Sequence, residues 1–226
     1  MLKPLTVAAC VAAGVASSAL VTIPSAAAQP CPDVEVVFAR GTSEPPGVGG
    51  IGGSFVDALR SRVGGRSMSV YAIKYAASSD FGNPDFPKTF VDGVRDATSH
   101  IQSMATSCPR TREVLGGFSQ GAAVAGYVTS SSVPEGVPAA SVPQPLSADV
   151  ADHIAAVALF GTPSQKFLSH LNAPPIVIGG TYQSKTVQLC APGDGICGTG
   201  NDPAAHASYG VNGMTSQAAD FVVGHL

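Results

Sequence analysis

The pentapeptide Gly117-Phe118-Ser119-Gln120-Gly121 decides the fold, because it has the form G-x-S-x-G between an apolar run and a run of small residues. In this pattern a strand turns sharply into a helix, and the turn lifts the serine hydroxyl clear of the sheet. Side chains two positions on either side of the serine would collide where strand and helix meet, which accounts for the two outer glycines. The pentapeptide therefore predicts a nucleophile elbow, with Ser119 as the nucleophile.

Residues 1–28 have the features of a secretory signal peptide. Lys3 precedes an apolar stretch over 5–23, and the small residues that end at Ala28 form a cleavage site. The stretch is rich in Ala, Ser and Gly and has no basic stop-transfer flank, which argues against a retained membrane anchor. We predict a single mature domain over 29–226, secreted to the exterior or associated with the cell envelope.

The charge and hydropathy of the mature part exclude several classes of partner. Removal of Lys3 takes the formal net charge from −3 to −4, and no basic run remains, so nucleic acid is not expected as a partner. No apolar stretch of helix length follows Ala28, which predicts a soluble protein without a stable membrane anchor. We expect a monomer that acts on a small-molecule or lipid ester.

Four of the five cysteines lie in the predicted mature part. An even number in an exported chain suggests two disulfides, for which three connectivities exist. Cys190 and Cys197 flank a tight loop rich in Pro and Gly, which favours their pairing with each other. Cys31 and Cys108 would then join the N-terminus to the segment before the elbow strand. A zinc site is the competing interpretation, but no C-x-x-C pair or nearby histidine cluster supports it, and we predict no metal.

Short apolar runs alternate with helix-like segments along the chain. This alternation predicts an α/β fold in which a mostly parallel sheet of five or six strands is covered on both faces. The expected strands are 34–39, 70–75, 112–115, 155–160, 176–178 and 185–189, and the expected helices are 55–63, 89–105, 122–129 and 213–225.

The segment 130–147 carries four prolines and no apolar periodicity. It predicts a surface loop after the elbow helix. A flap over the substrate site and a tolerated insertion are both consistent with it, and its polarity favours the insertion.

A nucleophilic serine needs a base, and the base needs an acid that orients it. In sheet-built hydrolases these residues follow the serine in the order acid, then histidine. Asp194 lies just past the expected strand 185–189, and His206 lies between the last strand and the last helix. We predict Asp194 as the acid and His206 as the base. Asp202 is the alternative acid, but it precedes a proline and is only four residues from His206.

The other four histidines fit the role of base less well. His100 precedes the serine, His153 lies at the entry end of a strand, His170 has no following strand to present it, and His225 is next to the chain end. Catalytic groups gather instead at the carboxyl ends of parallel strands.

The oxyanion formed by attack on a carbonyl needs at least two donors aimed at it. We predict the backbone N–H of Gln120 as one donor and Thr42, in the loop after the first strand, as the other. The stretch 47–52 matches G-x-G-x-x-G, but it does not follow directly on a strand, and no acidic residue closes the second strand. Nucleotide binding is therefore not expected, and no cofactor is predicted.

Four motifs, taken in order, resemble the cutinase family and especially its bacterial cutinase-like esterases. They are the stretches 38–44 (FARGTSE), 117–121 (GFSQG), 157–161 (VALFG) and 190–197 (CAPGDGIC), with His206 after the last. The resemblance covers essentially the whole mature chain.

The resemblance implies a small lidless α/β-hydrolase, with three layers around a central five-stranded parallel sheet. It implies Ser119, Asp194 and His206 as catalytic residues, Thr42 and Gln120 as the oxyanion hole, and the disulfides Cys31–Cys108 and Cys190–Cys197. The implied activity is hydrolysis of carboxylic esters with short to medium acyl chains, with some members accepting lipids, polyesters or acetylated xylan.

The sequence departs from the family pattern in two places. The pair Thr42-Ser43 has the order Thr-Ser where many relatives have Ser-Thr, which preserves a hydroxyl at position 42. The segment 130–147 is longer than usual, which leaves the acyl-chain preference open. Asn83 aligns only loosely with an asparagine that supports the oxyanion loop in relatives.

Two other hypotheses belong to different functional classes. A secreted hydrolase-fold protein with a purely binding role would have no reason to keep the serine, acid and histidine in order. An acetylxylan-type esterase or an acyltransferase would share the same acyl-enzyme.

Overall fold

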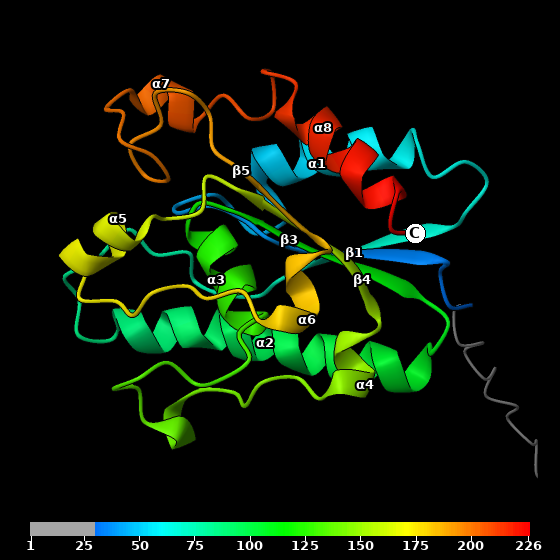
Figure 1. Ribbon diagram of the computed structural model, residues 1–226, viewed down its shortest axis with the longest axis horizontal. Coiled ribbons are helices and arrows are strands. Elements are labelled where there is room, and N and C mark those ends of the chain that lie inside the picture. Colours follow the sequence, from blue (N-terminus) through cyan, green and yellow to red (C-terminus); the bar gives the residue numbers. More distant parts are fainter. Residues whose placement is uncertain (1–29) are drawn as a thin grey trace, which may run out of the picture. The chain divides into compact units, whose positions relative to one another are not determined.

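A sheet of five parallel strands, in the order β2-β1-β3-β4-β5, forms the centre of the protein in the computed structural model (Figure 1). The structure describes residues 30–226, and the predicted signal peptide lies outside the described residues. The strands are β1 (Val34–Ala39), β2 (Met68–Ala72), β3 (Arg112–Phe118), β4 (Ile154–Phe160) and β5 (Thr186–Leu189).

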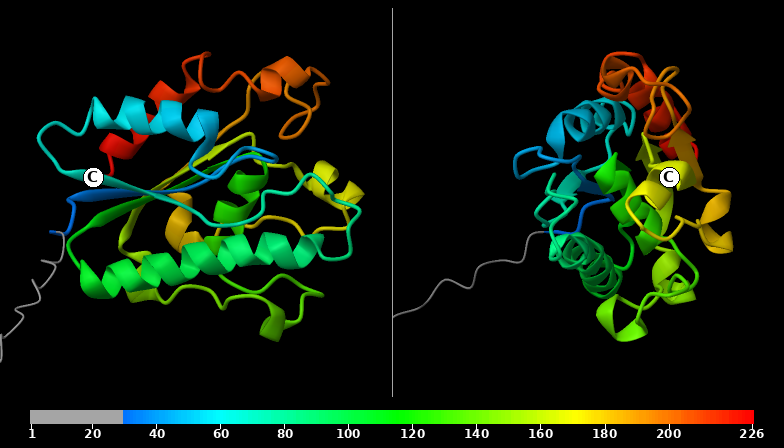
Figure 2. Two further views of the ribbon diagram at one scale, coloured as in Figure 1. Left: turned by 180° about the vertical axis from the view of Figure 1, so that it is seen from behind. Right: turned by 90° about the vertical axis from the view of Figure 1, so that its left-hand side faces the viewer.

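Helices cover both faces of this sheet, as the alternating pattern predicted. The longer helices are α1 (Gly49–Arg60), α2 (Phe86–Ser107), α3 (Gln120–Val128) and α8 (Met214–Val223). The short helices are η1 (Ala139–Ser141), α4 (Ala148–Ala151), α5 (Gln165–His170), α6 (Gly180–Gln183) and α7 (Pro203–His206). Two opposite views place α1 and α8 on one side of the sheet and α2 and α3 on the other (Figures 1 and 2).

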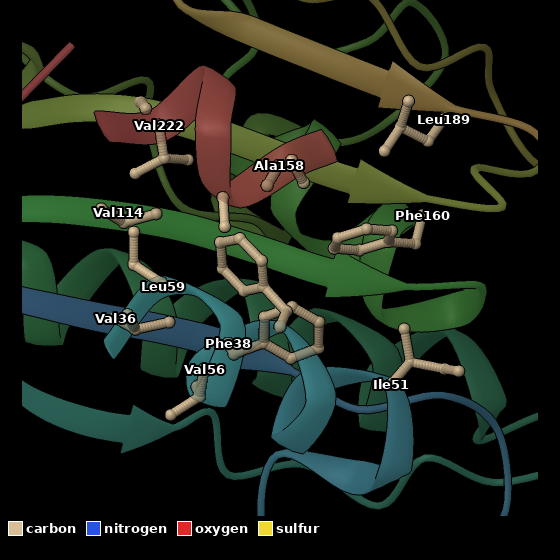
Figure 3. Close-up of a cluster of buried hydrophobic side chains, with 14 of the residues drawn as sticks. Val36, Phe38, Ile51, Val56, Leu59, Val114, Ala158, Phe160, Leu189 and Val222 are labelled. Carbon is tan, nitrogen blue, oxygen red and sulfur yellow. The ribbon is translucent and has the colours of Figure 1, made fainter. Parts of the chain in front are cut away.

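The alternation of side chains along β1 builds two separate cores. Val36 and Phe38 point toward α1 and α8, where they pack with Phe55 and Phe160 in the cluster shown in Figure 3. Val37 and its neighbours on the same face pack against α2 and α3. The sheet is thus buried on both faces, which is the usual environment of an all-parallel sheet.

Helix α1 begins earlier than the sequence predicted. Its periodic apolar residues predicted a start at position 55, whereas the helix begins at Gly49. The carboxylate of Glu44 accepts the N–H of Gly50 at 2.7 Å and satisfies a free donor of the first turn. The glycines of this turn carry no periodic signal, so the pattern missed them.

The strand predicted over 176–178 is wrong, because this segment makes no ladder with the sheet. It lies against the end of α3, where Oγ of Ser130 donates to the carbonyl of Val177 at 3.1 Å and the N–H of Gly179 donates to the carbonyl of Thr129 at 2.9 Å. A short apolar run looks the same whether a sheet or a helix buries it.

Both cysteine pairs of the predicted mature part form disulfides, Cys31 with Cys108 and Cys190 with Cys197. The first joins the start of the described chain to the end of α2, and the second closes the loop after β5. Among residues 30–226, no helix combines the length and the apolar character that crossing a membrane requires.

Candidate active site

Ser119 lies in the turn between β3 and α3, with a positive φ of 54° and a ψ of −117°, a strained combination for a residue with a side chain. Its N–H donates to the carbonyl of Phe160 on β4 at 2.9 Å. A Cβ on Gly117 would lie 2.2 Å from the carbonyl oxygen of Gly121, and one on Gly121 would lie 2.1 Å from the carbonyl oxygen of Ala39. Both glycines are thus required by close backbone approach, as the sequence pattern predicted.

The three residues predicted as nucleophile, base and acid lie in one hydrogen-bonded chain. Nε2 of His206 is 2.9 Å from Oγ of Ser119, and Nδ1 of His206 is 2.8 Å from Oδ2 of Asp194. An ionised carboxylate only accepts, so Nδ1 carries the proton and Nε2 is left to accept from the serine hydroxyl. This tautomer is the one that a general base for Ser119 requires.

The side chain of Asp194 is completely buried, whereas 21% of the His206 side chain is exposed. The carboxylate accepts the N–H of Ile196 at 2.8 Å and the hydroxyl of Tyr209 at 2.5 Å, in addition to its contact with His206. Burial alone would raise the pKa of Asp194, but the hydrogen bonds from Tyr209, His206 and Ile196 outweigh it and lower that pKa. The acid therefore stays ionised.

Tyr209 is a residue of the site that the sequence did not reveal. It is fully buried, and its hydroxyl accepts the N–H of Ala191 at 3.0 Å while it donates to Asp194. A tyrosine in a polar stretch before the last helix gives no local signal of this role. Only the folding of α7 and the disulfide loop against each other brings it to the carboxylate.

Replacement of Tyr209 by phenylalanine should destabilise the protein by about 1.5–3 kcal/mol at neutral pH, because a hydrogen bond to a buried charge is lost. That hydrogen bond favours the ionised acid, so its contribution is present above the unfolded-state pKa of about 3.8 and disappears as the pH falls through the lower folded pKa. Urea unfolding of both proteins at a series of pH values measures this difference.

Tyr182→Phe is the matched control, because Tyr182 is also buried and its hydroxyl has no hydrogen-bond partner in the part of the chain that the structure describes. The Tyr182→Phe substitution should change the free energy of unfolding little at any pH. A deficit of Tyr209→Phe that stays constant with pH would show that the loss comes from the hydrogen bond with the N–H of Ala191, which does not titrate, and not from the charge of Asp194.

The loop that carries Thr42 is tied to the segment after β2. The guanidinium of buried Arg40 donates to the carbonyls of Glu44 at 2.7 Å and Tyr75 at 2.6 Å, and the Tyr75 hydroxyl donates back to the carbonyl of Arg40 at 2.5 Å. The Arg40 guanidinium also lies over the Tyr75 ring, 5.1 Å from its centre. These contacts hold Thr42 beside the elbow. The sequence showed Arg40 only as part of a family motif.

Thr42 and Gln120, the two predicted donors, both line the same cavity as Ser119. Gln120 is the first residue of α3, so its N–H is one of the free donors at that helix end. The side-chain amide of Gln120 makes a separate hydrogen bond, in which it donates to the carbonyl of Ser78 at 2.9 Å.

Asp202 and Asn83, two further candidates from the sequence, make contacts outside the chain of hydrogen bonds from Ser119 to Asp194. Asp202 caps α7 by accepting the N–H of Ala204 at 2.9 Å. Asn83 interacts with Asp80 and with the N–H of Asp85, and no hydrogen bond joins it to the loop that carries Thr42 in the described structure.

A cavity of about 940 Å³ opens beside Ser119 and His206. Its lining is largely apolar and includes much of the proline-rich segment over 130–145. This location favours the flap interpretation of that segment over an insertion without a role. The apolar lining includes Phe86, Phe90, Val94, Tyr127, Val133, Val137, Leu168 and Leu171.

The parallel sheet, the helices on both faces and the strained serine turn at the carboxyl end of β3 define an α/β-hydrolase. The family model for cutinases matches residues 30–226. The chain belongs to the cutinase family and is a carboxylic ester hydrolase.

Two relatives and one solved structure show how close the similarity is. The probable carboxylesterase Culp7 of Mycobacterium tuberculosis is 62% identical over 166 residues, which cover 74% of this chain and 89% of that protein. The carboxylesterase Culp1 of the same species is 48% identical over 214 residues, 92% of this chain and 90% of that protein. The structure of Trichoderma reesei cutinase with a phosphonate inhibitor matches with a TM-score of 0.63 and 31% identity, covering 86% of this chain and 77% of that one.

Proposed function

We propose that the protein is a secreted serine esterase that hydrolyses carboxylic esters with apolar acyl chains through an acyl-enzyme. The observation that carries this proposal is the chain of contacts from Ser119 through His206 to buried Asp194, at the mouth of an apolar cavity. The two disulfides are in keeping with an oxidising compartment. We further propose that residues 1–28 are removed as a signal peptide and that residues 29–226 act as one monomeric domain.

In the proposed reaction, Nε2 of His206 takes the proton of Ser119 as Oγ attacks the ester carbonyl. The N–H of Gln120 and the donors of Thr42 stabilise the oxyanion, and Asp194 stabilises the imidazolium that forms. The alcohol leaves with the proton from His206. Water, deprotonated by the same nitrogen, then releases the acid and restores Ser119.

The acyl chain is proposed to occupy the cavity between α2 and the segment 130–145. The cavity lies within the 300–1,000 Å³ range of ordinary ligand sites, and its apolar lining suits an alkyl chain better than a sugar. A non-hydrolytic binding role is not favoured, because an oriented histidine against the serine hydroxyl serves proton transfer and has no use in a binder.

A series of p-nitrophenyl esters from acetate to palmitate tests the proposal on the purified, oxidised protein. Each buried methylene contributes about 0.8 kcal/mol, so kcat/KM should rise from acetate by up to about fourfold per methylene until the cavity is filled. A fluorophosphonate probe should label Ser119 at the same time. Absence of labelling would overturn the serine mechanism, whereas a maximum at acetate would overturn the acyl-cavity assignment.

Val137→Ser provides the variant for the cavity, because Val137 lines it from the segment 130–145. The variant should lose activity on the longer esters and keep activity on acetate. Val211→Ser is the matched control, since Val211 is 89% exposed and lies outside the cavity. Equal effects of the two variants would show that the segment does not contact the acyl chain.

A further inference from the structure

Two glutamates lie side by side near the amino ends of two neighbouring central strands. Ser119 lies at the opposite, carboxyl end of the sheet. Glu35 on β1 is in register with Glu113 on β3 and with Ser69 on β2. Neighbours in register share a face of the sheet, and Glu35 alternates with Val36 onto the face that α2 covers. Two carboxylates therefore meet beneath a helix, although like charges directly opposite each other are unfavourable.

His100 on α2 completes the group. Its Nε2 lies 2.8 Å from Oε2 of Glu35, while Oγ of Ser69 donates to Oε1 of Glu35 at 3.0 Å. The imidazole stacks on the ring of Tyr71, with ring centres 3.5 Å apart and an angle of 7° between the planes. The Tyr71 hydroxyl is in turn held by Asp96 at 3.0 Å. The histidine is thus oriented toward the glutamates by neighbours that do not compete for its Nε2.

Glu113 is the unusual member, because it is 1% exposed and neither carboxylate oxygen has a hydrogen-bond partner among residues 30–226. A buried polar group without a partner is costly, and a buried charge is more so. Within the part of the chain that the structure describes, no salt bridge joins Glu113 to a basic side chain, and Glu35 already contacts the nearby imidazole of His100.

One ligand atom from each of Glu35, His100 and Glu113 lies within 4.8 Å of the other two. We propose that these three side chains bind a divalent transition-metal ion, of which Zn²⁺ is the best match. Two carboxylates and a neutral imidazole balance its charge, and oxygen and nitrogen are ligands that zinc accepts in sites completed by water. The His100 side chain is 19% exposed, so the group lies near the surface on this side.

The site is separate from ester hydrolysis and would stabilise the fold by joining α2 to β1 and β3. The other group of potential ligands, Cys190, Asp194 and Cys197, has both sulfurs in a disulfide and does not compete as a thiolate site.

The test is a Zn²⁺ titration of the purified, oxidised protein after dialysis against a chelator, followed by calorimetry and thermal unfolding. The wild type should bind one ion per chain, and its Tm should rise by about 5–10 °C when free Zn²⁺ exceeds Kd a hundredfold. Glu113→Gln keeps the shape of the side chain but removes its charge, and it should weaken binding at least about tenfold. His100→Gln, at a partly exposed position, should do the same.

His170→Gln is the matched control, because His170 is an exposed histidine on α5 outside the group. It should leave the affinity for Zn²⁺ unchanged. The proposal is overturned if the wild type shows no Zn²⁺-dependent rise in Tm, or if Glu113→Gln and His100→Gln both retain it. A wild type that binds no zinc, together with a Glu113→Gln variant of equal stability, would instead identify Glu113 as a buried neutral acid.

Discussion

Replacing Ser119 with alanine should lower kcat by about 10⁴–10⁶-fold without unfolding the protein. In the proposed mechanism this hydroxyl forms the acyl-enzyme, and its 2.9 Å contact with Nε2 of His206 is the route for its proton. Alanine fits the same backbone position, since the fold at this turn depends on the absence of side chains at the two flanking glycines. Turnover of a p-nitrophenyl ester, with Tm measured on the same sample, checks both parts.

The double variant Ser119→Ala/His206→Ala separates a concerted pair from two independent contributions. Residues that act as a unit show grossly non-additive losses. The kcat of the double variant should therefore lie within a few-fold of the kcat of Ser119→Ala. Ser103→Ala, at an exposed serine on α2, is the control for the substitution itself. Near-normal activity of a folded Ser119→Ala protein would refute the proposed nucleophile.

Replacing Gly121 with alanine should destabilise the protein by at least about 3 kcal/mol. The new Cβ would lie 2.1 Å from the carbonyl oxygen of Ala39 and 2.4 Å from that of Arg40, both of which are backbone atoms. No rotamer relieves such a contact, so α3 must move away from β1. Urea unfolding with intact disulfides measures the loss. Any folded fraction should be nearly inactive, because movement of α3 away from β1 separates Gln120 on α3 from Thr42 in the loop after β1.

Gly53→Ala is the matched control for this substitution. Gly53 lies in helix α1, and a Cβ there would have no atom within 4 Å. Alanine is favoured over glycine inside a helix by about 1 kcal/mol, so this variant should be as stable as the wild type or more so. A Gly121→Ala protein of wild-type stability would show that the close approach of strand and helix is not needed.

The sequence predicted the fold class and the residues that contact Ser119, because both depend on patterns within short stretches of the chain. Apolar periodicity and turn residues report directly on strands and helices, and the parallel arrangement then fixes where strand ends meet. The order of Ser119, Asp194 and His206 along the chain limited the choice, and the structure brings these three side chains into contact. Their catalytic roles remain proposals that the substitutions above test.

The wrong predictions of strand and helix bounds fall where a hydrogen-bond partner outside the apolar pattern decides the local structure. The run over 176–178 has strand-like composition, but the end of α3 takes up its hydrogen bonds. The first turn of α1 has no apolar periodicity and depends on the carboxylate of Glu44. The segment 130–147 gave no pattern at all, and only its position against the cavity suggests a role.

By itself, therefore, the sequence determined the hydrolase fold, the elbow and the residues able to carry the chemistry, because each of these depends on residue type and short spacing. Tertiary structure alone decided the setting of those residues. Tyr209 reaches Asp194, Arg40 joins the loop that carries Thr42 to Tyr75, and Glu113 meets Glu35 and His100. Such contacts are set by strand register and helix packing, which bring together residues that share no local pattern.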